Sequence, residues 1–333
     1  MAGSRVEDKV DFQADVGDGG DNGGFFRMER VIHVLTGCTA VGKTELALRW
    51  AEAHGAEIVS CDSQLFYRGM DVGTAKPTAA ECARVPHHLI DIRDLTEPMD
   101  VTHYVTLARA AVADIHARGR AVLVTGGSGF YLRAYFGPVA DEVEIVAELR
   151  EEIRRTLASE GLGVLVAELQ RLNPEGLGAL DWKNPRRVVR ALERCRASGR
   201  PLAELQREFA ARPAPFADWK VRLCELVREK EDLERRIEAR VAVMLRDGLV
   251  AEVRGLLANG LERNPSAARA IGYRETIDFL EGRLPEGELA AAIVRNTRAL
   301  VKKQRTWFKT QLPPHAQIDG ASVEFWQLLV PPV

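Results

Sequence analysis

Eight residues, GCTAVGKT from Gly37 to Thr44, have the types and spacing of a phosphate-binding turn. They follow an apolar run at residues 31–35 and open a helical pattern, a context that an ordinary strand-to-helix turn shares. Glycines let consecutive backbone N–H groups point at an anion, and the helix adds the positive end of its dipole. Lys43 supplies a point charge. We therefore predict a phosphate-binding P-loop made of Gly37, Cys38, Thr39, Ala40, Val41, Gly42, Lys43 and Thr44.

The hydroxyl of Thr44 predicts a metal. The Ser or Thr that follows the lysine of a P-loop binds Mg²⁺, so we expect Mg²⁺ as the cofactor and Thr44 as its ligand. Such a turn recognises a diphosphate whatever is attached to it. The sequence therefore leaves open whether ATP is bound.

A carboxylate is expected close to the P-loop. Asp62 follows an apolar run at residues 57–60, which places it at the carboxyl end of a predicted strand, where α/β proteins bind ligands. There it could accept a proton as a general base. The residues alone leave a second interpretation equally open, in which Asp62 caps the next helix or holds magnesium, as in a nucleoside triphosphatase.

The elements that position these residues follow an alternating pattern. Helical patterns separate the first four apolar or β-rich runs, which is typical of a parallel sheet covered by helices on both faces. From residue 141 to 214 the pattern is helical throughout. We predict an α/β fold with a P-loop parallel-sheet core at residues 28–140 and 215–333, and an all-helical insertion domain at 141–214. The predicted strands are residues 31–35, 57–60, 89–92, 121–125 and 221–226.

The composition indicates a cytoplasmic globular protein. Hydrophobic residues make up 46% of the 333 residues, enough for a sizeable core, and no run reaches the roughly 18 apolar residues that a membrane span needs. The amino terminus lacks the apolar stretch of a signal peptide. The five cysteines are odd in number and scattered, which predicts neither disulfides nor a zinc site.

Charge is unevenly distributed along the chain. Residues 1–27 carry six acids against three bases and a glycine cluster, the composition of a disordered acidic tail. Met28, just before the first predicted strand, is an alternative start of the chain. The last long predicted helix gathers basic residues on one side, a pattern that favours contact with phosphate groups of a nucleic acid over a merely solvated face. These basic residues are Arg295, Arg298, Lys302, Arg305 and Lys309, with Lys303 near the boundary.

Further motifs follow the P-loop in order. They are DS at 62–63, YRGMDVGTAKP at 67–77, HHLIDI at 87–92, GGSGFYL at 126–132, NPRRVVRALE at 184–193, AIGYRE at 270–275 and KQRTWF at 303–308. In this combination the chain resembles the tRNA dimethylallyltransferases, enzymes that prenylate the adenosine beside the anticodon. The likeness covers about residues 28–310 and rests on the combination, because each short motif alone is weak.

The resemblance implies transfer of a dimethylallyl group from dimethylallyl diphosphate to the exocyclic amine of that adenosine, with Mg²⁺. It implies that Asp62 is the base, and that Thr39, Lys43, Arg187 and Arg240 contact the diphosphate. The chemistry agrees, because an adenine amine is a poor nucleophile and a diphosphate leaves only if its growing charge is stabilised. Judged from their neighbours in the sequence alone, Arg187 and Arg240 would also fit ordinary solvated helix faces.

The resemblance also implies a channel across the core, with the prenyl donor at the P-loop end. The adenine, turned out of the anticodon stem-loop, enters from the other end. The insertion and the basic helix would clamp the RNA. Cys38 and Leu65 depart from the proline and glutamine usual in the family, and Ser128 replaces a frequent threonine. The residues implied to contact tRNA are Asp62, Ser63, Gln64, Leu65, Ser128, Arg186, Arg187, Val188, Val189 and Arg190.

Three rival functions follow from the same residues. An adenylate isopentenyltransferase would prenylate free AMP, ADP or ATP and would need no RNA clamp. A small-molecule kinase would use the P-loop for ATP, and a non-catalytic RNA-binding module would carry a vestigial one, which the intact Lys43 disfavours. The helical insertion and the basic helix favour tRNA. We expect a monomer, because no heptad seam indicates association.

Overall fold

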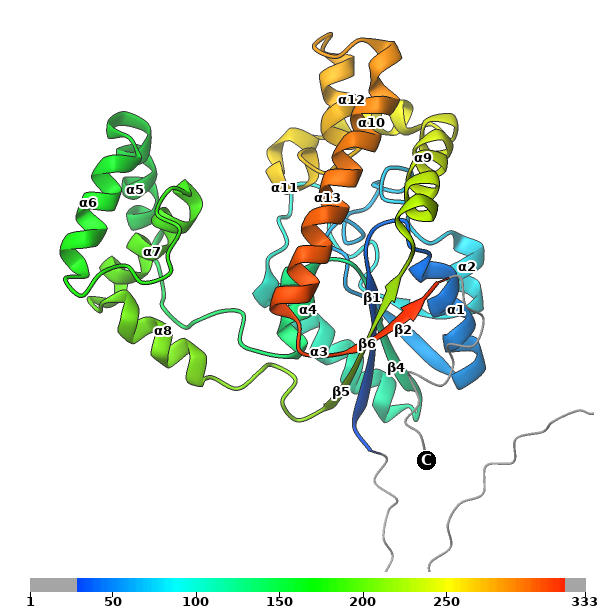
Figure 1. Ribbon diagram of the computed structural model, residues 1–333, viewed down its shortest axis with the longest axis horizontal. Coiled ribbons are helices and arrows are strands. Elements are labelled where there is room, and N and C mark those ends of the chain that lie inside the picture. Colours follow the sequence, from blue (N-terminus) through cyan, green and yellow to red (C-terminus); the bar gives the residue numbers. More distant parts are fainter. Residues whose placement is uncertain (1–28, 321–333) are drawn as a thin grey trace, which may run out of the picture.

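A six-stranded parallel sheet forms the centre of the computed structural model, which describes residues 29–320 (Figure 1). The strand order is β3-β2-β4-β1-β5-β6, and each neighbouring pair is parallel. The α/β parallel-sheet fold predicted from the sequence is confirmed. The predicted acidic tail, residues 1–27, lies outside the described residues. The strands are β1 (Val31–Gly37), β2 (Ala56–Ser60), β3 (His87–His88), β4 (Ala121–Thr125), β5 (Lys220–Val227) and β6 (Ala316–Asp319).

Helices cover both faces of this sheet. In β2, Ile58 lines a cavity together with Ala47 of α1 (Lys43–His54), so this side of the strand looks toward α1. The neighbouring Glu57 instead bonds Arg118, which directly follows α3 (Val101–Ala117). Because successive side chains of a strand point to opposite faces, α1 and α3 lie on opposite sides of the sheet.

Two strands differ from the sequence prediction. The strand predicted at 89–92 is wrong, because pairing is limited to His87–His88 and the backbone of Leu89 and Asp91 then turns left-handed, with φ of 63° and 54°. Such a conformation ends a strand. The strand β6 was not predicted from the sequence. It is only four residues long and pairs with β5.

The carboxyl-terminal half adds a layer of helices beside the sheet. The long helix α13 (Leu289–Gln311) packs against α9 (Lys230–Arg246) and leads back to β6 (Figure 1). None of the described helices combines the length and the apolar character needed to cross a membrane. The helices of the core besides α1 and α3 are α2 (Ala79–Arg84), α4 (Gly129–Leu132), α9 (Lys230–Arg246), α10 (Leu249–Ala258), α11 (Pro265–Ala268), α12 (Tyr273–Leu280) and α13 (Leu289–Gln311). Short 3₁₀ turns are Arg133–Tyr135, Leu261–Arg263 and Glu286–Glu288.

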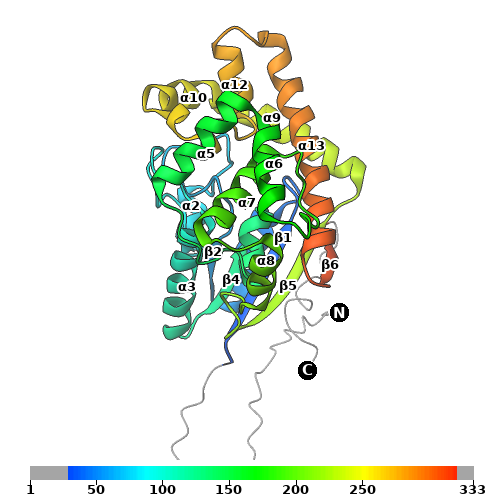
Figure 2. The same cartoon turned by 90° about the vertical axis from the view of Figure 1, so that its left-hand side faces the viewer.

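Four helices form a separate unit between α4 and β5, named here the helical unit. They are α5 (Ala147–Glu160), α6 (Leu162–Leu172), α7 (Pro185–Ser198) and α8 (Leu202–Ala211). Figures 1 and 2 show this unit beside the core, joined by the segments before α5 and after α8. It has a hydrophobic core of its own, and buried Asn173 ties two of its helices by bonding the carbonyl of Leu169 and the amide of Leu202.

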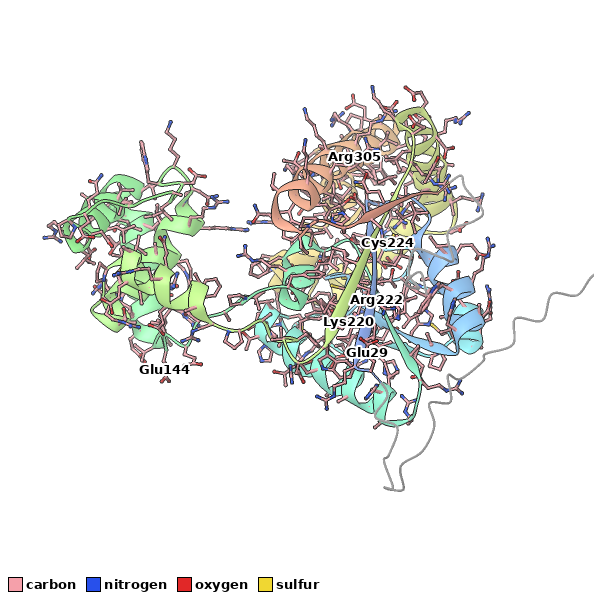
Figure 3. The ribbon with its side chains drawn as sticks, turned by 60° about the horizontal axis from the view of Figure 1, so that its bottom comes forward. Glu29, Glu144, Lys220, Arg222, Cys224 and Arg305 are labelled. Carbon is pink, nitrogen blue, oxygen red and sulfur yellow. The ribbon has the colours of Figure 1, made fainter. Side chains whose placement is uncertain are left out.

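The two ends of the sheet differ in what they carry. At the amino ends of β1 and β5, Lys220 pairs with Glu29 at 2.7 Å (Figure 3). This exposed ion pair adds little stability. At the carboxyl ends lie the P-loop after β1, Asp62 after β2 and the glycine pair after β4. The edge of the sheet that binds ligands in α/β proteins is therefore the edge that holds the chemically active residues.

Candidate active site

The P-loop connects β1 to α1, and two glycines fix its shape. A side chain on Gly37 would begin 2.4 Å from the carbonyl oxygen of Leu226 in β5, so only glycine fits there. Gly42 caps α1 with φ of 101°, a left-handed conformation that favours glycine. The Nζ of Lys43 donates hydrogen bonds to the carbonyls of Gly37 (2.8 Å) and Cys38 (2.9 Å). The ammonium group is therefore held within the turn.

Two arginines of the α9 region hold the outside of the P-loop. Arg228 Nε donates to the carbonyl of Val41 at 2.6 Å, and Arg236 Nε donates to that of Ala40 at 2.8 Å. Ala40 itself has a left-handed φ of 67°, which is uncommon without a glycine. Both contacts use carbonyl oxygens, so they stabilise the turn without occupying the N–H groups that an anion would need.

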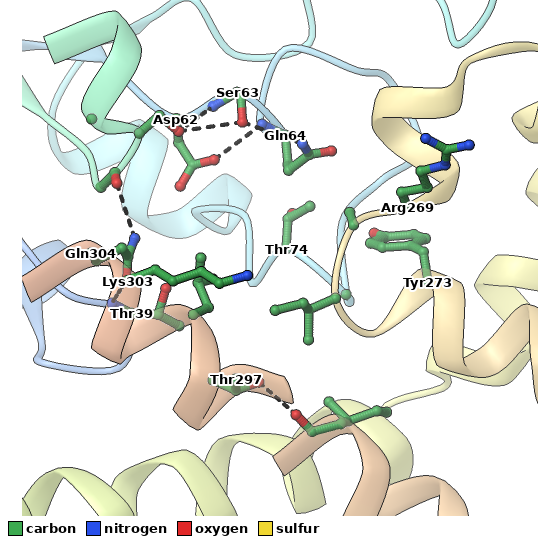
Figure 4. Close-up of a pocket in the computed structure, with 18 of the residues that line it drawn as sticks. Thr39, Asp62, Ser63, Gln64, Thr74, Arg269, Tyr273, Thr297, Lys303 and Gln304 are labelled. Carbon is green, nitrogen blue, oxygen red and sulfur yellow. Dashed lines mark hydrogen bonds between the residues drawn. The ribbon is translucent and has the colours of Figure 1, made fainter. Parts of the chain in front are cut away.

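Gln304 of α13 joins the P-loop to the loop after β4. Its Oε1 accepts from the backbone N–H of Thr39 at 3.0 Å, and its Nε2 donates to the carbonyl of Gly127 at 2.9 Å (Figure 4). A side chain on Gly127 would lie 2.9 Å from that same amide, so the close approach needs a glycine. One side chain thus fixes the distance between two loops of the site.

Asp62 begins a loop that is held by short local contacts. Its Oδ1 accepts from the N–H of Gln64 at 3.0 Å, and the Oγ of Ser128 accepts from the N–H of Ser63 at 2.9 Å (Figure 4). The second oxygen of Asp62 takes part in neither of these contacts. The backbone of the loop is therefore positioned while the carboxylate stays at the surface of a cavity.

Two cavities adjoin at Asp62. The larger, about 650 Å³, reaches α9, α12 and α13, and the smaller, about 510 Å³, contains the P-loop. Figure 4 shows Asp62, Ser63 and Gln64 on one side of the larger cavity and Thr297 on the opposite side. That the cavities adjoin follows from the four residues that line both of them, which are Thr39, Asp62, Thr74 and Arg240.

The predicted site residues divide between these cavities. Lys43 and Thr44 line the smaller one, whereas Ser63, Gln64 and Ser128 line the larger. Leu65 lines only the smaller cavity, whereas Ser63 and Gln64, with which it was predicted to contact RNA, line only the larger. Cys38 and Val41 are buried under the turn, which leaves them only backbone groups to offer a ligand.

The junction of the cavities is electrically positive on its P-loop side. Burial lowers the pKa of Lys43 to about 8, while Asp62 raises it and Arg240 lowers it further. Burial also holds the pKa of Arg240 below its usual range, and its Nη2 donates to the carbonyl of Thr74 at 2.8 Å. Two partly buried cations and one carboxylate share this junction, an arrangement that favours binding of an anion.

The loop that carries Thr74 is fixed by Glu252 of α10. Its carboxylate accepts from the backbone N–H groups of Asp71 (3.0 Å), Val72 (2.6 Å) and Gly73 (3.1 Å), and from the hydroxyl of Tyr273 at 2.6 Å. Charge-assisted hydrogen bonds of this kind are stronger than neutral ones. The position of Thr74, and with it that of Arg240, therefore depends on a residue outside both cavities.

The predicted arginines of α7 lie in the helical unit. Asn184 caps this helix by accepting from the backbone N–H groups of Arg186 and Arg187. The side chains of Arg186, Arg187 and Arg190 are exposed, and neither cavity includes them. Val188 is fully buried in the unit's own core, and Val189 packs against that core. Arg187 therefore lies outside the cavity that contains the P-loop, and its predicted contact with the diphosphate stays a prediction.

The basic side of α13 is partly neutralised by the fold. Arg298 pairs with Glu238 (2.7 Å) of α9, and Arg305 donates to the carbonyl of Arg228. Lys303 lines the larger cavity and so lies close to the chemistry rather than on an outer face. This stretch of sequence contains no acidic residue, so the ion pair could not be predicted from it. The partner carboxylate comes from another helix.

Several residues of the site carried no assigned role in the sequence analysis. Gln304 stood within the motif KQRTWF, and Thr74 within YRGMDVGTAKP, so the motifs located them without revealing their contacts. Arg228, Arg236 and Glu252 lie outside every motif. Each binds backbone atoms about 180 residues or more distant, and no local pattern indicates such a contact.

A divalent metal would find few protein ligands here. Among residues 29–320, no group of three or more His, Cys, Asp or Glu side chains could hold a metal ion. Thr44 lines the smaller cavity beside the P-loop. Mg²⁺ suits such a site, because it keeps several waters and binds mainly through phosphate oxygens.

Comparisons with known proteins identify the family of this chain. The family model described as IPP transferase matches residues 65–311. The tRNA dimethylallyltransferase of Opitutus terrae is 66% identical over 290 residues, which cover 87% of this chain and 93% of that protein. The crystal structure of the tRNA isopentenylpyrophosphate transferase of Bacillus halodurans is 33% identical, with a TM-score of 0.62 over 88% of this chain and 90% of the other.

A third comparison concerns the fold alone. The structure of a eukaryotic dimethylallyltransferase, 24% identical, covers 90% of this chain and 76% of its own, with a TM-score of 0.76. The high identity to the Opitutus terrae protein extends over nearly its whole length. The chain therefore belongs to the tRNA dimethylallyltransferase family.

Proposed function

We propose that this protein transfers the dimethylallyl group of dimethylallyl diphosphate to the exocyclic amine of the adenosine next to the anticodon in tRNA. The products are N6-(dimethylallyl)adenosine and diphosphate. Membership of the family supports this activity. The single observation that carries the chemistry is the pair of cavities that adjoin at Asp62, one containing the P-loop and the other large enough for a base.

The smaller cavity provides the site for the diphosphate. The N–H groups of the P-loop, the ammonium of Lys43 and the guanidinium of Arg240 supply positive charge around it. This charge stabilises the leaving group as the bond between the allylic carbon and the diphosphate oxygen breaks. Thr39 lines both cavities and would contact the diphosphate where the two reactants meet.

The larger cavity provides the site for the adenine. In an anticodon loop the amine is covered by stacked neighbours, so the base must be turned out to reach Asp62. Asp62 then removes a proton from the amine as its nitrogen attacks the allylic carbon. Gln304 and Ser128 hold the loops around this point, which keeps the two reactants in line.

Mg²⁺ fits the donor groups of the smaller cavity, with Thr44 as its protein ligand. When bound, it would neutralise charge on the diphosphate. The exposed arginines of α7 and the basic residues of α13 would contact the RNA backbone. Of the α7 arginines, Arg190 also pairs with Glu193 of the same helix at 3.4 Å. Arg187 would approach the diphosphate only if the helical unit moved toward the core on RNA binding.

The experiment is an incorporation assay with purified protein, Mg²⁺ and radiolabelled dimethylallyl diphosphate. We expect label in an anticodon stem-loop with an adenosine beside the anticodon, and none in AMP. A stem-loop with that adenosine replaced by guanosine is the matched control. Label in free AMP alone would indicate the adenylate enzyme, and release of ADP from ATP without carbon transfer would indicate a kinase.

A further inference from the structure

Two hydroxyl groups in the wall of the smaller cavity have no hydrogen-bond partner. They are the Oγ of Ser60, whose residue is 2% exposed, and the Oγ1 of Thr125. A buried hydroxyl without a partner loses the hydrogen bonds that it makes in water, so native proteins nearly always satisfy it. A pair of such groups in a binding cavity points to a ligand that completes them.

The two hydroxyls are neighbours in the sheet. Ser60 ends β2 and Thr125 ends β4, and the two residues are direct partners in the parallel register. Adjacent strands lie about 4.8 Å apart, so paired side chains that line the same cavity lie side by side. Both face α1, as Ile58 does two positions before Ser60.

Among residues 29–320, the other buried hydroxyls are satisfied within the protein. Thr36 donates to the carbonyl of Gly126 at 2.9 Å, and Thr276 donates to that of Gly272 at 2.6 Å. Ser60 and Thr125 differ from these threonines in their surroundings, because they share their cavity with Lys43 and Thr44 of the P-loop. The missing partners therefore belong to the site rather than to the packing of the sheet.

Resting on the function proposed above, we infer that Ser60 and Thr125 bind the water ligands of the Mg²⁺ that accompanies the diphosphate. Water on a divalent cation is a strong hydrogen-bond donor, and a hydroxyl has two lone pairs to accept from it. Groups that contact such ligands without touching the metal orient the metal's shell and raise its affinity. Asp62, which lines the same cavity, adds negative charge.

The test uses the full-length protein with Mn²⁺ as the probe, inorganic diphosphate and no RNA. Free and bound Mn²⁺ are separated by electron paramagnetic resonance. The double variant Ser60→Ala with Thr125→Val removes both hydroxyls and keeps the shapes close. We expect its Kd for Mn²⁺ in the presence of diphosphate to rise about tenfold, within the range typical of such outer contacts.

Controls separate this effect from damage to the fold. Thr276→Val removes a buried hydroxyl that already has a partner, and Thr125→Ser keeps a hydroxyl while changing the shape; both should bind Mn²⁺ as the native protein does. Unchanged Mn²⁺ affinity in the double variant would overturn the inference and leave the proposed function intact. Failure of the native protein to bind Mn²⁺ with diphosphate would overturn both.

Discussion

The core and the helical unit hold their candidate functional residues in contrasting ways. In the core, the P-loop and Arg240 are positioned by contacts that reach across the fold, and Asp62 is held by a contact within its own loop. In the helical unit, Arg186 and Arg187 project from the first turn of α7 into solvent. The core is thus arranged for chemistry before any substrate binds, whereas the helical unit presents charge that a large partner would have to organise.

This contrast predicts where substitutions act. A change in the core should alter the chemical step or the binding of the prenyl donor. A change on α7 should alter the binding of RNA and its dependence on salt.

In the comparison of the two regions, the largest effect on use of the prenyl donor is expected at Arg240 in the core. Arg240→Ala removes a partly buried cation from the junction of the cavities, so kcat/KM for dimethylallyl diphosphate should fall by about 100-fold. Steady-state kinetics with saturating stem-loop RNA measure it. Arg235→Ala, which removes an exposed arginine from the same helix, is the control and should change this ratio little. A loss of less than about threefold at Arg240 would argue against its role.

A smaller effect on affinity for the prenyl donor is expected when a rise in pH removes the charge of Lys43. Its pKa of about 8 means that the ammonium form dominates below pH 8 and is lost as the pH rises above it. Affinity for dimethylallyl diphosphate should therefore fall above pH 8, by up to about tenfold per pH unit, since one titrating charge is lost. Calorimetric titrations of the native protein and Lys43→Met from pH 7 to 9.5 measure this. Parallel profiles in the two proteins would contradict the assignment.

The smallest effect is expected at Arg187 in the helical unit. Arg187→Ala should weaken binding of stem-loop RNA by about fivefold and reduce the salt dependence of binding by about one ion, as the loss of one phosphate contact does. Its KM for dimethylallyl diphosphate should stay unchanged. Arg155→Ala on α5 removes an exposed arginine of the same unit as a control. A raised KM for the donor would instead support the contact with the diphosphate that the family resemblance implies.

Local sequence predicted the parts of the fold that local physics decides. The strands at β1, β2, β4 and β5 follow from apolar runs, and the turn at 37–44 follows from glycine spacing. Tertiary contacts decided the rest. The strand at His87–His88 is shortened by backbone turns at Leu89 and Asp91, and β6 forms only because β5 offers an edge.

Prediction of the candidate site from local sequence was limited in the same way. Asp62 and Lys43 could be located from motifs because their chemistry depends on neighbours close in the chain. Gln304 and Glu252 could not be interpreted, since their partners Thr39 and Val72 lie about 265 and 180 residues away in the sequence. The place of Arg187 depends on how one packed unit sits beside another, which the pattern of its own helix does not encode.

In the proposed mechanism, Asp62 takes the proton where the two cavities adjoin. Single-turnover transfer with Asp62→Ala, saturated with donor and stem-loop RNA, tests it most directly. We predict a rate at least about 100-fold below that of the native protein, with the Kd of RNA unchanged. A native rate in this variant would contradict the claim.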